Sequence, residues 1–243
     1  EEVTVKTERF ASASDLHLLA LRYQVTAKKD CQITVDTGID ANIWDINGPH
    51  LPTVEEGAVG ELLYIDGETG ELSHTVAVSD VMRAAFSYKK EKVITEDRRS
   101  VRVFSFEMKK GETATFTKYI SIYTTVDGVA DPLKSSQEAA SAAAEKGFDV
   151  LLAEHEAVWA ERWEAADVQI EGDDEAQLAL RDNIYIMYSN VPTHTDAVAI
   201  PARGLAGQVY KGAMFWDTEV YMMPLFNYTH PDYARNLAYY RVN

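Results

Sequence analysis

Alternation of apolar and polar residues dominates the first half of the chain. From Val3 to about Val126 the sequence consists of short alternating runs separated by turn residues, the pattern of an antiparallel sheet with one solvated face. In the run from Leu16 to Thr26, apolar and aromatic residues occupy the odd positions, and we expect this face to point into a core: His17, Leu19, Leu21, Tyr23 and Val25. Further strands are predicted at Cys31–Thr37, Val59–Ile65, Leu72–Val78, Val101–Met108 and Thr113–Thr125, with turns at Asp66-Gly67 and Lys110-Gly111. So many short strands indicate a β-sandwich or barrel.

The period of the pattern changes near Asp127-Gly128. From Ser135 to Ala166 the chain is rich in Ala and Glu, and its apolar residues return at helical spacing. Six residues fall on one helical stripe: Phe148, Leu151, Leu152, His155, Trp159 and Trp163. Gly147 precedes them as a break, so we expect a short helix followed by a longer one.

The remaining third of the chain is predicted to be helical. After a strand-like Val168–Ile170, Asp173 or Asp174 can cap a helix that carries Leu180, Ile184, Met187 and Tyr188. Two more helices are predicted over 218–226 and 229–240. Strands followed by helices predict two domains, one all-β and one all-α.

Charge and composition exclude several classes of function. The 243 residues carry 39 acidic and 23 basic side chains, a net charge of −16 that would repel nucleic acid and anionic membranes. Cys31 is the only cysteine, which excludes an internal disulfide and a thiolate zinc site, and the six histidines lack metal-ligand spacing. The first residues do not resemble a secretion signal, and the sequence holds no run of about 18 apolar residues. We therefore expect a cytoplasmic protein without metal or organic cofactor.

Candidate chemistry concentrates between Pro201 and Glu219, where glycines, aromatic residues and carboxylates alternate. A flat indole such as Trp216 can cover the C–H face of a pyranose ring, and a neighbouring carboxylate such as Asp217 can accept two sugar hydroxyls. The same residues have a structural interpretation: Trp216 in a core, Asp217 or Thr218 as a helix N-cap, and Glu219 as a first-turn acid.

A longer match favours the sugar-binding interpretation. The run from Gly212 to Pro224, which contains Phe-Trp-Asp-Thr-Glu, and the run from Tyr228 to Leu237 followed by Tyr240-Arg241 are similar to the signature of glycoside hydrolase family 65. This resemblance implies the maltose, kojibiose and trehalose phosphorylase group. It also implies that Trp216 and Asp217 contact the glucosyl unit, with Tyr210, Phe215 and Glu219 as further candidates.

The same resemblance implies the domain plan. Residues 1–127 would form part of a β-sandwich of the supersandwich type, incomplete because the family has more strands before Glu1. Residues 128–167 would form a helical linker, and residues 168–243 the first helices of an (α/α)6 barrel.

The family is an inverting one, in which a carboxylic acid protonates the departing oxygen while phosphate attacks the opposite face of the sugar. That acid is expected downstream of Asn243, as is the binding site for inorganic phosphate, so this chain would hold no catalytic residue and would be inactive alone. Its expected partners are a disaccharide, phosphate, the remainder of the catalytic domain and a second copy in a homodimer.

Two alternatives remain open. The reaction could be hydrolysis, as in trehalase-type members of the family, with water in place of phosphate. Alternatively, the protein could bind carbohydrate without catalysis. The sequence does not determine which disaccharide linkage is cut.

Overall fold

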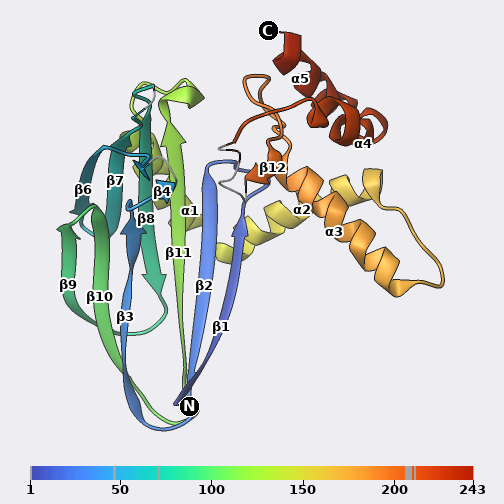
Figure 1. Cartoon of the computed structure of the whole chain (residues 1–243). Coiled ribbons are helices and arrows are strands. Elements are labelled where there is room, and N and C mark those ends of the chain that lie inside the picture. Colours follow the sequence, from blue (N-terminus) through green and yellow to red (C-terminus); the bar gives the residue numbers. More distant parts are fainter. Residues whose placement is uncertain (1, 46–47, 71, 206–209, 211, 243) are drawn as a thin grey trace. The chain divides into compact units, whose positions relative to one another are not determined.

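The computed structural model describes residues 2–45, 48–70, 72–205, 210 and 212–242 (Figure 1). The chain divides into two compact units, Glu1–Glu156 and Ala157–Asn243. The first unit holds the antiparallel sheets and the first helices, and the second unit is mostly helical, which confirms the predicted order of strands and then helices. The domain boundaries after residues 127 and 167 and the closed barrel stay predictions.

Two packed sheets form the first unit. The six-stranded sheet has the order β1 (Val3–Ala11), β2 (Leu18–Ala27), β11 (Thr113–Thr124), β8 (Thr75–Ala84), β7 (Leu62–Glu68) and β6 (Thr53–Val59). The three-stranded sheet has the order β3 (Cys31–Asp40), β10 (Arg99–Met108) and β9 (Lys89–Glu96), and two short strands, β4 (Trp44–Asp45) and β5 (Gly48–Pro49), pair separately. Every neighbouring pair is antiparallel, as the sequence predicts.

The core between the sheets contains large aromatic and aliphatic side chains. Phe104 and Phe106 of β10 face Val25 of β2 and Phe116 of β11, and Tyr23 packs at the margin of this cluster. The prediction that the odd face of β2 points into a core is therefore confirmed for Tyr23 and Val25. The pair Lys110-Gly111 forms the predicted turn, whereas Asp66 and Gly67 lie inside β7 and the turn predicted there is wrong.

The other face of the six-stranded sheet is also covered, so the prediction of one solvated face is wrong. Helix α1 (Pro132–Lys146) lies across β8, β11 and β7 (Figure 1). Alanines of α1 and the first turns of α2 (Phe148–Ala166) pack against the even positions of β2 and against residues of β8 and β11. The buried residues of this cluster include Leu18, Ala20, Val81, Tyr119, Ala140, Ala143, Ala144, Phe148 and Leu151. Short alanine side chains let the helix approach the sheet closely. Gly147, with φ of 89°, separates the two helices at the predicted break.

The second unit is built from helices around one aromatic core. It contains the end of α2, α3 (Asp174–Asn190), the short β12 (Ala202–Leu205), the π-helix η2 (Thr218–Met222), α4 (Met223–Thr229) and α5 (Pro231–Val242). The Asp173 carboxylate accepts a hydrogen bond from the Ala176 amide at 2.9 Å and caps α3 as predicted. Val168–Ile170 is not a strand. The most deeply buried side chains of this unit are Tyr188, Phe226 and Leu237.

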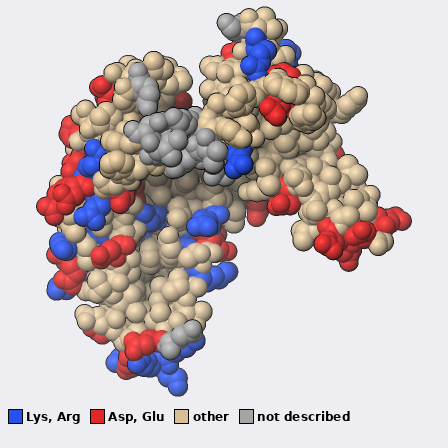
Figure 2. Space-filling model, viewed as in Figure 1, with Lys and Arg blue, Asp and Glu red and all other residues tan. Residues whose placement is uncertain are grey.

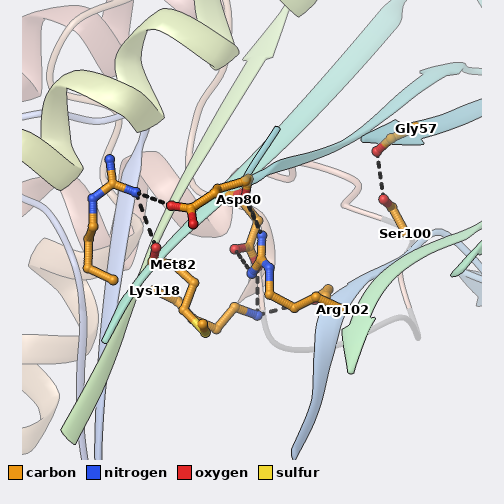
Figure 3. Close-up of polar contacts among 9 residues, drawn as sticks. Gly57, Asp80, Met82, Ser100, Arg102 and Lys118 are labelled. Atoms are coloured by element: carbon orange, nitrogen blue, oxygen red, sulfur yellow. Dashed lines mark hydrogen bonds and ion pairs between the residues drawn. The ribbon is translucent and has the colours of Figure 1, made fainter. Parts of the chain in front are cut away.

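A charged network lies buried between the two sheets (Figure 3). Asp80 of β8 is fully buried, and its two carboxylate oxygens lie 2.6 Å from Arg102 Nη1 and 2.8 Å from Lys118 Nζ. Arg102 also donates to the backbone oxygens of Asp80 and Glu61, and Lys118 donates to the carbonyl of Gly38. These bonds connect β8 and β11 of one sheet with β10 and β3 of the other.

Acidic side chains are prominent on the surface. Figure 2 shows them gathered over the turn between α2 and α3, where the sequence carries Glu171, Asp173, Asp174 and Glu175. None of the helices in the described part of the chain is long and apolar enough to cross a membrane.

Candidate functional site

The predicted sugar-binding residues lie between β12 and the π-helix η2. Backbone hydrogen bonds shape this region: the Ala202 amide donates to the Ala213 carbonyl at 3.2 Å, and the Ala213 amide donates to the Tyr210 carbonyl at 2.8 Å. The chain then runs through Phe215 and Trp216 into η2. We call residues 215–219 the WDTE segment.

Trp216 lies on the surface, so its alternative interpretation as a core residue is wrong. Its side chain is 62% exposed, and its ring lies 6.1 Å from that of Tyr221, tilted by 41°. Phe215 is also exposed and packs edge-on against Tyr210, with ring centroids 6.0 Å apart. The segment therefore presents several aromatic rings outside the core.

Asp217 stands directly before η2, yet its side chain caps no backbone amide, so the interpretation as an N-cap is wrong. Its φ of −52° and ψ of −37° are already helical, whereas a capping residue typically has extended dihedrals. The side chain is half-buried and forms no hydrogen bond or ion pair with any other described residue. Its carboxylate is therefore available for a ligand.

Neighbouring residues of the segment are fixed by long-range contacts. The Thr218 side chain is buried, and its hydroxyl donates to the Ile200 carbonyl at 2.8 Å. Glu219 forms a two-pronged ion pair with Arg241 of α5, through Nε at 3.1 Å and Nη2 at 3.2 Å. The Glu219 carboxylate thus already has a partner, and its predicted contact with substrate stays a prediction.

A polar contact inside the core supports the helices below this segment. The Tyr188 hydroxyl donates to Thr229 Oγ1 at 2.8 Å and lies 2.6 Å from His230 Nδ1. Burial raises the pKa of Tyr188. Burial, and then the nearby Arg162, lower the pKa of His230, which favours its neutral form.

Two cavities in the described part of the chain are lined by other residues. One lies at the edge of the sandwich beside Leu63, Met82, Phe104 and Arg102, and an open groove lies beside Trp163, Asp167 and Arg181. Neither Trp216 nor Asp217 lines either of these two cavities.

Two residues that hold the WDTE segment were not predicted. Both belong to the matching sequence runs, but the sequence offered Thr218 only as an alternative helix N-cap and assigned Arg241 no role. The Thr218 hydroxyl instead donates to the Ile200 carbonyl, 18 positions away. For Arg241, the contact joins residues 22 positions apart, which no local pattern reveals.

Comparison with known proteins identifies relatives of both parts of the chain. The chain matches the N-terminal domain of glycosyl hydrolase family 65 over residues 1–162 and the central catalytic domain of that family over residues 181–243. It is 38% identical to a nigerose phosphorylase of Lachnoclostridium phytofermentans and 34% identical to a kojibiose phosphorylase of Thermoanaerobacter brockii, over 99% and 97% of this chain.

A solved structure, a putative kojibiose phosphorylase from the human microbiome, superimposes with a TM-score of 0.89 at 20% identity over 99% of this chain and 32% of that one. The chain spans about a third of the length of its curated relatives, 35% of the nigerose phosphorylase and 32% of the kojibiose phosphorylase. Its two successive domain matches, together with its sandwich and helices in the same order, place this chain in glycosyl hydrolase family 65.

Proposed function

We propose that this chain is part of an inverting glycoside phosphorylase that acts on an α-linked glucosyl disaccharide. The observation that carries the proposal is an exposed indole beside a carboxylate without a described partner, Trp216 and Asp217. The relatives support the class of substrate, because they are named as phosphorylases of nigerose, kojibiose, trehalose and maltose.

The two side chains would contact different parts of one glucosyl unit. The apolar face of Trp216 would cover the C–H face of the ring. The Asp217 carboxylate would accept hydrogen bonds from two hydroxyls, and such charge-assisted bonds are about twice as strong as neutral ones. Phe215 and Tyr210 would extend the aromatic wall beside Trp216.

The rest of the reaction would use groups outside this chain. A carboxylic acid downstream of Asn243 would protonate the departing oxygen, and phosphate would attack the opposite face of the sugar. Inversion at an α-linked carbon gives β-glucose 1-phosphate and a free acceptor. No cofactor is needed, since phosphate is itself an anionic nucleophile. The remaining helices of an (α/α)6 barrel would complete the pocket, residues 1–243 alone would be inactive, and the whole protein would form a homodimer.

The test is an assay of the protein extended to the length of its relatives. Nigerose, kojibiose, trehalose and maltose would each be incubated with and without inorganic phosphate, and the release of β-glucose 1-phosphate and free glucose measured. The proposal predicts sugar phosphate that appears only with phosphate. Free glucose at the same rate without phosphate would instead indicate a trehalase-type hydrolase. Binding of a disaccharide without any turnover would indicate a non-catalytic carbohydrate-binding protein.

A further inference from the structure

We propose that Arg241 is a positioning residue that holds the Trp216–Asp217 pair in the orientation needed to bind the sugar. This inference rests on the proposed function and extends it to a side chain that touches no substrate. It follows from three hydrogen bonds that one guanidinium makes to both ends of the WDTE segment.

The guanidinium of Arg241 brackets the two sugar-binding residues. Its Nη2 donates to the Phe215 carbonyl at 3.0 Å, immediately before Trp216. The same Nη2 and Nε donate to the two carboxylate oxygens of Glu219, two residues after Asp217. One rigid planar group therefore fixes the backbone before the pair and the side chain after it.

This geometry requires arginine rather than lysine. A guanidinium offers several donors in a fixed plane, whereas an ammonium acts as a compact point charge on a flexible stem. A lysine at position 241 could pair with Glu219 but would not reproduce the forked contact together with the bond to the Phe215 carbonyl.

The contact also controls charge at the proposed sugar site. Without Arg241, Glu219 would be an unpaired carboxylate two residues from Asp217. With Arg241 in place, Asp217 is left as the available carboxylate of the segment.

The other contacts of the pair are mostly local: the Phe215 carbonyl also accepts from the Thr218 amide at 3.3 Å, and the Trp216 carbonyl accepts from the Val220 amide at 3.1 Å. Thr218 is anchored through Ile200, which fixes the backbone after Asp217. Trp216 touches the ring of Tyr221, which is itself 70% exposed. Among these contacts, those of the Arg241 and Thr218 side chains tie the segment to distant parts of the chain, and the orientation of Trp216 and Asp217 depends on them.

A matched control lies on the same helix. Arg235 is an exposed arginine of α5 that pairs with Asp232, one turn away, at 2.7 Å. Loss of Arg235 removes an exposed ion pair of similar type without touching the WDTE segment. Arg235→Ala therefore reports what the loss of a surface charge on this helix costs.

The experiment compares Arg241→Ala, Arg241→Lys, Asp217→Ala, the double variant of Arg241→Ala with Asp217→Ala, and Arg235→Ala in the full-length protein. Steady-state phosphorolysis and melting temperature are measured for each. We expect Arg241→Ala to lower kcat/KM about 10- to 100-fold, since a displacement near 1 Å of a positioning group can cost about 100-fold. Arg241→Lys should lose at least about 10-fold by the same principle, and Arg235→Ala should match the wild type.

The double variant supplies the decisive comparison. If Arg241 acts through the WDTE segment, the loss in the double variant should be smaller than the product of the two single losses, because residues that act as a unit are non-additive. Two effects that multiply, or an Arg241→Ala enzyme as active as Arg235→Ala, would overturn the inference. Should Arg241→Ala melt much lower than Arg235→Ala, Arg241→Lys takes its place in the same double-variant comparison.

The outcome separates this inference from the proposed function. A severe loss in Asp217→Ala with full activity in both Arg241 variants refutes the role of Arg241 and leaves the sugar site intact. Full activity in Asp217→Ala refutes the sugar site itself.

Discussion

Asp80→Asn tests whether the charged network between the sheets stabilises the first unit as its geometry implies. The substitution keeps the size of the side chain and one acceptor oxygen but removes the negative charge. Arg102 and Lys118, whose side chains are only 11% and 8% exposed, would then be two buried cations without a counter-charge. Removal of one partner from a buried ion pair costs about 3–5 kcal/mol. Because domains are stable by only about 5–15 kcal/mol, this loss is a large part of the total.

The assay is denaturant unfolding followed by far-UV circular dichroism, with the free energy of unfolding taken from linear extrapolation. Glu61→Gln is the matched control, because Glu61 is half-exposed and pairs with Arg83 and Lys90 on the surface. An exposed pair contributes about 0–1 kcal/mol, so the control should stay within that range. If Asp80→Asn lowers the free energy of unfolding by less than about 1 kcal/mol, the buried network contributes no more than an exposed pair, and its proposed stabilising role is refuted.

Three further substitutions or conditions test the rest of the fold. Gly38→Ala should destabilise the sandwich by about 1–3 kcal/mol or more, because a Cβ there would lie 2.0 Å from a backbone oxygen of β10; Gly70→Ala, with its nearest neighbour at 3.5 Å, should be nearly neutral in the same denaturant assay. Tyr188→Phe should cost about 1 kcal/mol, because the half-buried His230 loses the partner of its Nδ1 and Thr229 Oγ1 loses a donor while it still donates to the Leu225 carbonyl; calorimetry that detects no change would contradict this. Burial lowers the pKa of His230, so the unfolded chain takes up a proton below about pH 6.5 that the folded chain does not. The contribution of His230 is therefore complete above that pH and is lost as the pH falls through the folded pKa, and a melting temperature recorded from pH 8 to pH 5 should show this fall in the wild type and not in His230→Asn.

Local signals in the sequence predicted much of the fold. Gly147 marked the break between two helices because its φ of 89° suits glycine, and Asp173 marked a helix start because its side chain caps the Ala176 amide. The turn predicted at Asp66-Gly67 was wrong for a physical reason that concerns Gly67. It lies inside β7 with Leu51 packed where a side chain would be, so this glycine permits close approach rather than a turn.

Nonlocal packing explains what the sequence did not predict. The second covered face of the six-stranded sheet depends on α1, whose alanines give a weak apolar pattern on their own. The network around Asp80 could have been suspected, because Asp80, Arg102 and Lys118 each interrupt an apolar strand. Which cation meets the carboxylate depends on how the sheets stack, and no spacing along the chain contains that information.

The candidate site also combines features that local sequence indicates with contacts that depend on nonlocal packing. The structure shows Trp216 exposed and Asp217 half-buried without a described partner, and the glucosyl contact that the Phe-Trp-Asp-Thr-Glu run implied stays a prediction. Arg241 contacts the segment only because α5 folds back toward η2, which the motif does not reveal.

The most direct test of the sugar site is a crystal structure of the protein, extended to the length of its relatives, with glucose bound. We expect the pyranose ring to lie against the Trp216 indole, with two of its hydroxyls within about 2.5–3.0 Å of the Asp217 carboxylate. Glucose bound elsewhere, with Asp217 turned away from every hydroxyl, would contradict it.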